Sequence, residues 1–424
     1  MVIEIRLSNM FSIKDEIILD MRSGGSKSKN AEALASNCFS YNDIDLLKSV
    51  AIYGANASGK SNILKAIIFS CLMVLNSHNH NENVVFNFRP FKFDGYEKKP
   101  SSFYIRFVHE GIEYEYSFSL TQTEIVTEAL YYYPNGRRAE VFYRDERLGN
   151  DKSKVYRFKN AIKRPLDVAI NTSKKTLFVS RASQMDRDVA KSVFAFFNNY
   201  LMFRPSLSGS MVEALFTTYK REILTALQIA DSDIVDVIMK KEKRVGPVET
   251  VHLQFTTFHK GDPSIPFDME TEESDGTKRL FVHMIYLLDI LRNNKAILWD
   301  EIELSLHSKI VEYIFTLFHR SAGAQLICTT HNTNLLDLHK MRKDQIYFVN
   351  KKEDGSSDLY SLFDYKDFRD TMDLEKAYLQ GQSSEKSITV LTSADLRKNS
   401  SGGKAKKKGS ERKKMDFRDI EEFE

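Results

Sequence analysis

The chain has 424 residues, 42% of them hydrophobic, which is typical of a folded protein with two or three domains. Its net charge of +3 excludes a strongly basic or strongly acidic protein. We see no apolar run with the roughly 20 residues of a membrane span and no signal-peptide layout, so we expect a cytoplasmic protein without membrane contact. Three widely spaced cysteines indicate neither a disulfide framework nor a zinc site.

The charge is unevenly distributed along the chain. Residues 397–414 carry nine Lys or Arg and one Glu, so the remaining residues are acidic overall. This pattern differs from that of a uniformly basic nucleic-acid binder. After about Gly381 the apolar periodicity is lost, and we expect the tail to lack stable structure of its own.

The first predicted elements are strands. The stretch "VIEIRLSNMFSIKDEIILDM" alternates apolar and polar residues over two runs, which predicts two strands of a hairpin or edge sheet. "LLKSVAIYG" then ends in a buried strand, and "SNILKAIIFSCLMVL" continues as an apolar helix. Strand, loop and helix in this order form the context that a phosphate-binding loop requires.

Between that strand and helix lies "YGANASGKSN", residues 53–62, which fits the pattern G-x-x-x-x-G-K-S. Backbone N–H groups of such a loop cradle phosphates, Lys60 is expected to reach the outer oxygens, and Ser61 is expected to hold Mg²⁺. The residues predicted to bind the nucleotide, which the later motifs identify as ATP, are Gly54, Asn56, Ala57, Ser58, Gly59, Lys60, Ser61 and Asn62.

From residue 85 the pattern changes to aromatic, alternating segments. Breaks at Glu110-Gly111 and at residues 134–136 predict successive hairpins. Helical patterns follow in residues 186–203 and 210–230, and we expect the polar turn after them, with Asp231 and Asp233, to cap another helix. The predicted elements after this turn are a strand at 249–258, a helix at 277–294, a strand at 295–301, a helix at 307–321 and strands at 324–331 and 344–352. This alternation near the C-terminus is typical of a parallel α/β layer.

A second chemical motif follows the strand in "KAILWDEIELSLHS". Asp300 and Glu301 come at its carboxyl end, where ligands of an open parallel sheet bind. Asp300 suits the Mg²⁺ shell, and Glu301 suits the orientation and polarisation of an attacking water. The alternative is an ordinary acidic loop after a core strand.

The spacing of the two motifs indicates which class of phosphate-loop protein the chain resembles. Lys60 and Asp300 are 240 residues apart, whereas compact nucleotide-binding folds place such motifs within about one domain's length of roughly a hundred residues. A large segment is therefore inserted between two halves of one sheet. In this the chain resembles ABC-type ATPase heads, the group that contains RecF, SMC and Rad50 proteins. The fold class is accordingly α/β, a P-loop NTPase of the ABC-ATPase head type with a split sheet and an inserted region of hairpins and helices.

The resemblance to ABC heads implies further roles. "ESDGTKRLFVHM" matches the signature motif, so Ser274 and Gly276 would contact ATP held by a second copy; the alternative is that Ser274 simply caps a helix. His331 occupies the place of the histidine that senses the γ-phosphate. His307 stands where the family's D-loop has Asp, which puts a carboxylate role there in doubt. We leave the Q-loop glutamine unassigned.

Taken together, the motifs resemble those of one bacterial subgroup, the stand-alone ABC-fold ATPases of abortive-infection and anti-phage systems, similar to RloA, AbiLi and the AriA subunit of PARIS. The resemblance implies hydrolysis of ATP to ADP and phosphate, with Glu301, Lys60 and His331 as catalytic residues. It also implies a homodimer or higher oligomer that shares its ATP sites and controls a separate toxic effector such as a nuclease from a neighbouring gene. A phage-encoded trigger belongs to the same expectation.

The expected domains follow the motifs. Residues 1–84 form the N-terminal lobe with the phosphate loop, 85–260 the inserted region, 261–380 the C-terminal lobe, and 381–424 the tail. Two alternatives stay open: a RecF-like DNA-binding repair ATPase assisted by the basic tail, and a non-enzymatic scaffold in which ATP is a structural ligand.

Overall fold

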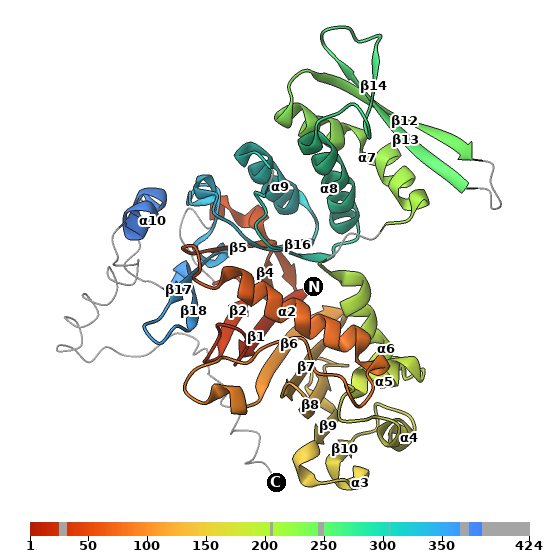
Figure 1. Ribbon diagram of the computed structural model, residues 1–424, viewed down its shortest axis with the longest axis vertical. Coiled ribbons are helices and arrows are strands. Elements are labelled where there is room, and N and C mark those ends of the chain that lie inside the picture. The colour runs from red at the N-terminus through yellow and green to blue at the C-terminus, as the bar shows by residue number, and fades with distance from the viewer. Residues whose placement is uncertain (25–31, 204–206, 245–249, 305, 365–372, 384–424) are drawn as a thin grey trace. The chain divides into compact units, whose positions relative to one another are not determined.

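The computed structural model describes residues 1–24, 32–203, 207–244, 250–304, 306–364 and 373–383. The chain divides into two compact units, Met1–Ala377 and Tyr378–Glu424. All sheets and both predicted motifs belong to the first unit (Figure 1). The basic stretch at 397–414 lies outside the described residues.

A six-stranded sheet carries both motifs. Its order is β11-β15-β16-β5-β17-β18, and all neighbouring strands are parallel except the last pair. β16 lies between the strands of the two motifs, so the sheet is assembled from distant parts of the chain, which confirms the predicted split sheet. The strands are β5 (Ser49–Tyr53), β11 (Leu201–Met202), β15 (Ala296–Trp299), β16 (Gln325–Thr329), β17 (Ile346–Lys351) and β18 (Ser357–Ser361).

A seven-stranded antiparallel sheet has the order β10-β9-β8-β7-β6-β1-β2. Its register confirms the predicted hairpins, with His109 opposite Ile112 and Tyr132 opposite Ala139. The strands are β1 (Val2–Ser8), β2 (Ile17–Asp20), β6 (Ser101–His109), β7 (Ile112–Leu120), β8 (Ile125–Tyr132), β9 (Ala139–Asp145) and β10 (Tyr156–Phe158).

Two small sheets complete the strands: β3 (Cys38–Tyr41) with β4 (Ile44–Leu47), and β12 (Ile234–Arg244), β13 (Thr250–His259) and β14 (Pro266–Asp268). The expectation that Asp231 and Asp233 cap a helix is wrong. Asp233 N donates to Asp231 Oδ1 at 2.9 Å in a turn, and β12 begins directly afterwards. The following β-branched residues favour a strand, which pairs with β13 along its length.

The α-helices are α2 (Lys60–Asn76), α3 (Lys152–Val155), α4 (Pro165–Ile170), α5 (Phe178–Gln184), α6 (Asp188–Ala195), α7 (Gly209–Ala230), α8 (Asp275–Arg292), α9 (Ser308–Arg320) and α10 (Leu374–Ser383). The helix expected through Phe203 ends earlier. A π-helical turn, η5 (Phe196–Tyr200), follows α6, and the next two residues join the six-stranded sheet. Short 3-10 turns are η1 (Ala35–Asn37), η2 (Ser77–Asn79), η3 (Tyr96–Lys98), η4 (Glu146–Leu148), η6 (Thr333–Leu335), η7 (Lys343–Gln345) and η8 (Leu362–Asp364).

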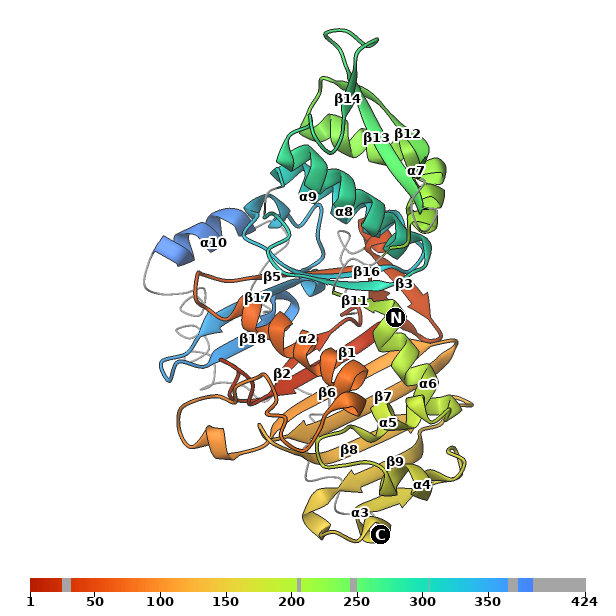
Figure 2. The same cartoon turned by 45° about the vertical axis from the view of Figure 1, so that its right-hand side comes forward.

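Helix α2 lies between the two large sheets (Figures 1 and 2) and contributes Ile63, Leu64 and Ile67 to the core that both sheets share. Because it is apolar around much of its circumference, the segment Lys60–Asn79 is the one described segment long and apolar enough to cross a membrane. Its most apolar window is 56% buried, as a core helix of a folded domain requires.

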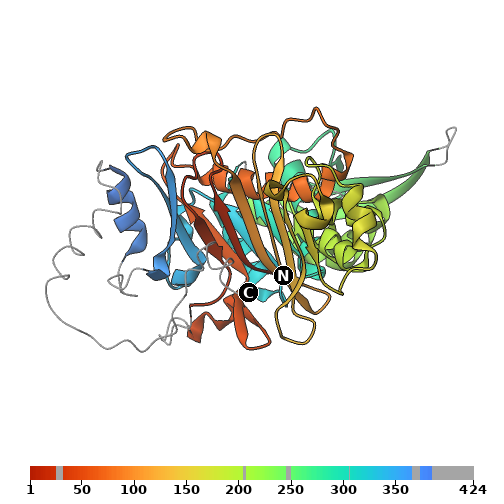
Figure 3. The same ribbon diagram turned by 90° about the horizontal axis from the view of Figure 1, so that it is seen from below.

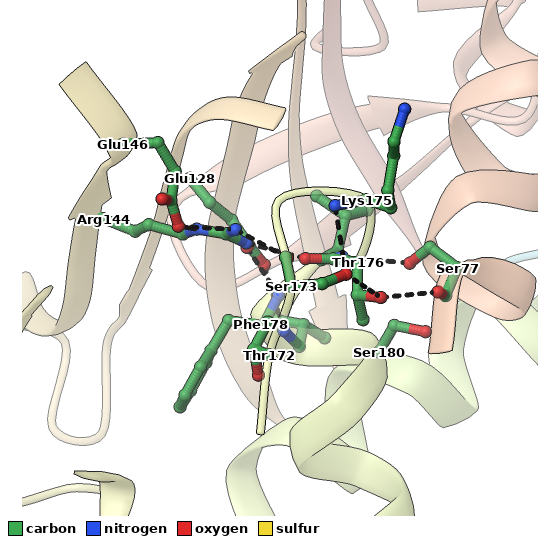
Figure 4. A network of polar contacts seen from close by, with 12 residues as sticks. Ser77, Glu128, Arg144, Glu146, Thr172, Ser173, Lys175, Thr176, Phe178 and Ser180 are labelled. Carbon is green, nitrogen blue, oxygen red and sulfur yellow. Dashed lines mark hydrogen bonds and ion pairs between the residues drawn. The ribbon is translucent and has the colours of Figure 1, made fainter. Parts of the chain in front are cut away.

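A buried polar network fastens the end of α2 to the seven-stranded sheet (Figure 4). Arg144 is fully buried between Glu128 and Glu146, at 3.3 and 2.8 Å, and Glu128 also accepts hydrogen bonds from Phe178 N and Val179 N at the start of α5. Figure 3 shows the yellow-green helical segment beside the strands of this sheet. Stacking of Phe107 on Phe196, with centroids 4.0 Å apart, holds the segment there.

Candidate functional site

The phosphate loop follows β5, whose five residues are all buried, and leads into α2. Gly59 at the turn into the helix has φ 108°, in the left-handed region, and a Cβ there would lie 2.0 Å from Ser357 Oγ. Both the backbone angle and the close approach therefore require glycine at this position of the predicted loop.

Two serines outside the motif brace the loop. Ser357 Oγ donates to Ser58 O at 2.6 Å and lies 2.8 Å from Ser12 Oγ, which accepts from Asn62 Nδ2 at 2.9 Å. Ser12 comes from the β1–β2 connection and Ser357 from β18, far from the motif in sequence, so neither was predicted as a site residue. No local pattern marks them, and only the fold brings them to the loop.

The loop also holds a hydroxyl without a partner. Ser58 is 4% exposed, and its Oγ is buried with no hydrogen bond in the described structure. A Cβ on Gly54 would lie 2.6 Å from this oxygen. Asn56 and Ala57 at the crest are exposed, and Ala57 has φ 62°. An unpaired buried donor costs about 1–3 kcal/mol, so this loop fits an anionic oxygen that would accept from it.

Lys60 begins α2 and turns back into the loop. Its ammonium donates to Gly54 O at 2.8 Å and to Ala55 O at 3.1 Å, and the residue is only 6% exposed. Burial lowers the pKa of Lys60, while the nearby carboxylates, Glu301 first and then Glu303 and Asp300, act in the opposite direction. The phosphate-loop lysine therefore lies close enough to the acidic residues after β15 to interact with them, and binding of ATP and Mg²⁺ between them stays a prediction.

The carboxylates after β15 are held by the neighbouring strand. Thr329, the last residue of β16, donates from Oγ1 to Asp300 Oδ1 at 2.6 Å and accepts from Glu301 N at 2.7 Å. Glu301 is exposed and has φ 50°, a conformation that costs about 1–2 kcal/mol for a residue with a side chain. The strand order therefore sets the position of both acidic residues.

Glu303 is a further carboxylate that the sequence analysis did not assign. It accepts from Thr330 Oγ1 at 2.7 Å and from His331 N at 2.5 Å. The imidazole of His331 belongs to an exposed residue just beyond β16, the location predicted for it. Glu303 is the last residue of "DEIE" in the sequence, but its hydrogen-bond partners could not be predicted from that motif.

The predicted signature residues lie at the start of α8. Ser274 Oγ accepts from Thr277 N at 3.1 Å, so Ser274 is the N-cap of the helix, and both Ser274 and Gly276 are exposed. Among the described residues, neither has a hydrogen bond to the phosphate loop. Their contact with ATP in a second copy stays a prediction. His307, at the D-loop position, caps α9 by accepting from Lys309 N at 3.3 Å.

The donor set fits magnesium better than a protein-caged metal. Within the described ranges, no group of three or more His, Cys, Asp and Glu residues could hold a metal ion. Mg²⁺ binds proteins through one or two oxygen ligands, together with water and substrate phosphates. Ser61 at the start of α2 and Asp300 after β15 are the residues that would supply such oxygens.

A phosphate loop after β5, an acidic pair after β15 and β16 between these strands define a P-loop NTPase fold with the split sheet of ABC-ATPase heads. Residues 49–337 match the model of the protein family described as "AAA domain, putative AbiEii toxin, Type IV TA system". The match covers more than half of the chain, so the chain belongs to this family of P-loop ATPases. Curated protein sequences contain no match.

Solved structures of SMC heads share a weak similarity with the chain. The SMC head bound to the C-terminal winged-helix domain of ScpA is 17% identical, with TM-score 0.41, over 85% of this chain and 97% of that one. The SMC head domain from Thermotoga maritima is 14% identical, with TM-score 0.38, over 85% of this chain and 98% of that one. A third structure is an SMC head with an extended coiled coil, bound to the C-terminal domain of ScpA from Pyrococcus furiosus. It is 15% identical, with TM-score 0.40, over 93% of this chain and 99% of that one. The fold assignment rests on the sheet order and the family match instead.

Proposed function

We propose that this protein hydrolyses ATP in a bacterial anti-phage (abortive infection) system, where its ATP-dependent dimer controls a separate toxic effector. The observation that carries the ATPase part is the strand order, in which the phosphate loop with Lys60 and the pair Asp300 and Glu301 follow the parallel strands β5 and β15 that flank β16. The defence context is supported by membership of a family described by an AbiEii toxin and a type IV TA system.

In this proposal the loop residues 54–62 bind the phosphates of ATP, with Lys60 and the hydroxyl of Ser58 as donors. Ser61 and Asp300 would hold Mg²⁺, which would neutralise phosphate charge when bound. Glu301 orients the attacking water and accepts its proton as the oxygen bonds to the γ-phosphorus and the bond to ADP breaks. His331 senses the γ-phosphate from the carboxyl end of β16.

The dimer follows from the exposed start of α8. Ser274 and Gly276 have no hydrogen bond to the phosphate loop among the described residues, and backbone N–H groups at a helix start favour an anion. We propose that a second copy supplies them, so that two composite ATP sites form between two chains. A separate toxic effector, such as a nuclease from a neighbouring gene, would then respond to opening and closing of the dimer.

The test is Glu301→Gln, with Glu110→Gln as the matched control in an exposed hairpin turn. Loss of the carboxylate should lower phosphate release by about 10²–10⁴-fold, the usual contribution of general-base catalysis, and should accumulate ATP-bound dimers in gel filtration with light scattering. Normal turnover in Glu301→Gln would refute its role. If the wild type released no phosphate with Mg²⁺, DNA and the neighbouring gene's product all supplied, the scaffold alternative would replace the proposal.

A further inference from the structure

The turn that carries His331 is fastened from three directions. Glu303 accepts from Thr330 Oγ1 at 2.7 Å and from His331 N at 2.5 Å. Tyr53, the residue before the phosphate loop, donates from its hydroxyl to Asn332 O at 3.1 Å. The carbonyl of Ser308 in α9 accepts from Asn332 Nδ2 at 3.5 Å. The turn is therefore tied to the phosphate loop, to the acidic segment after β15 and to α9.

Within this arrangement each carboxylate oxygen of Glu303 accepts one hydrogen bond. Thr330 Oγ1 donates to Oε2 while accepting from Asn332 N at 3.0 Å, and the backbone of His331 donates to Oε1. By contrast, the exposed carboxylate of Glu301 accepts no hydrogen bond from the described part of the chain. The two carboxylates near Lys60 thus have different environments, although both act on its pKa.

We infer that Glu303 is a positioning residue that holds the His331 turn in register with the site, and that it does not act as a second general base. This inference rests on the proposed ATPase function. Each oxygen of Glu303 accepts one of these two hydrogen bonds, and a proton taken from water would remove the negative charge that strengthens both, so the turn would lose part of its anchor. Glu301, without such partners, is free for that role.

The substitution Glu303→Gln distinguishes a positioning role of Glu303 from a general-base role, because the two roles predict different losses of activity. Glu303→Gln keeps an oxygen that can accept from His331 N, and its amide can donate to Thr330 Oγ1, whose hydroxyl proton then loses its partner. We expect kcat to stay within about tenfold of wild type, because one neutral hydrogen bond contributes about 0.5–1.5 kcal/mol. A general base would lose about 10²–10⁴-fold in the same variant. Such a loss in Glu303→Gln would overturn the inference.

Glu303→Ala removes both acceptors and should lower kcat by more than the Gln variant does, with a smaller effect on KM. The decisive measurement is a double-mutant cycle with His331→Ala. If Glu303 acts through His331, Glu303→Ala should add less than about threefold once His331 is gone, as expected for residues that work as a unit. Losses that multiply in full would show that Glu303 acts independently and would contradict the inference.

A readout without nucleotide separates this inference from the proposed function. Amide hydrogen exchange across residues 329–334 should be faster in Glu303→Ala than in wild type, close to wild type in Glu303→Gln, and unchanged in Glu301→Gln. Equal exchange in wild type and Glu303→Ala would refute the anchoring role even if ATP is hydrolysed. Conversely, protection lost only in Glu303→Ala, with no ATPase in the wild type, would retain the anchor and refute the proposed function.

A milder pair covers the case in which Glu303→Ala fails to fold. Thr330→Val removes the hydroxyl that donates to Glu303 at 2.7 Å and accepts from Asn332 N at 3.0 Å, whereas Thr330→Ser keeps it, so the informative amide is that of His331, which donates to Glu303 itself. We expect Thr330→Val to speed exchange in the turn and to lower kcat, and Thr330→Ser to restore both. If the two variants behaved alike, the hydroxyl contact with Glu303 would carry no positioning role.

Discussion

Thr329 Oγ1 donates a hydrogen bond to Asp300 Oδ1 at 2.6 Å, across the two neighbouring strands β16 and β15. Thr329→Val keeps the shape of the fully buried side chain but leaves Asp300 and Glu301 N without this partner. We expect kcat to fall by roughly tenfold or more, because a hydrogen bond to a charged group contributes about 1.5–3 kcal/mol, and the Mg²⁺ concentration at half-maximal rate to rise. Steady-state ATP hydrolysis against Mg²⁺ measures both. Thr329→Ser should recover most activity, and identical Mg²⁺ curves for Val and wild type would contradict the assignment.

Gly59→Ala should abolish nucleotide binding. An added Cβ would lie 2.0 Å from Ser357 Oγ at a residue with φ 108°, so the loop would have to move. Gly136→Ala is the matched control, because Gly136 has φ 71° in a hairpin turn and nothing within 4 Å of its Cβ position. We expect a fluorescent-ATP titration to show binding in the control and none in Gly59→Ala. Comparable affinities in the two variants would refute the role assigned to the close approach.

Removal of the buried arginine of the network in Figure 4 should destabilise the fold. Arg144→Met leaves the buried carboxylate of Glu128 without its cation, which typically costs roughly 3–5 kcal/mol, whereas Glu146 keeps Lys152 at 3.0 Å. Arg147→Met is the control, since its pair with Asp145 is on a side chain that is 65% exposed, and such pairs are worth about 0–1 kcal/mol. Urea unfolding gives the free energies. Equal losses in the two variants would show that burial does not set the value of the ion pair.

Acid should lower the free energy of unfolding through His319, which contacts Ser49, the first residue of β5. Burial, with a smaller effect of Lys48, lowers the pKa of His319 to about 4, and its Nε2 lies 2.8 Å from Ser49 Oγ. Because the unfolded chain takes up the proton first, this contribution is fully present above about pH 6.5 and declines as pH falls toward 4. It amounts to about 3 kcal/mol at most.

Unfolding free energies of His319→Gln and wild type between pH 4 and 7 test this contribution. The wild type should lose more stability than the variant over that window, whereas His339→Gln, at an exposed position, should follow the wild type. Parallel curves for His319→Gln and wild type would show that this histidine does not contribute to the acid sensitivity.

Local patterns in the sequence predicted much of the fold. Alternation marked β1 and the hairpins β6–β7 and β8–β9, and an apolar helix after a Gly-rich loop marked α2. Each of these elements depends on residues that are close in sequence, so the spacing of apolar residues along the chain was sufficient to predict it. β12 was missed because a polar turn at Asp231 was interpreted as a helix start.

The sequence by itself determined that residues 54–62 form a phosphate loop and that Asp300 and Glu301 follow a buried strand, because both motifs are contiguous. Only the tertiary structure decided which distant groups complete the site. Ser12 reaches the loop from the β1–β2 connection and Ser357 from β18, and Thr329 reaches Asp300 because β16 lies beside β15. These contacts depend on the strand order and on the packing of both sheets around one core, and the hydrophobic period along the chain does not encode them.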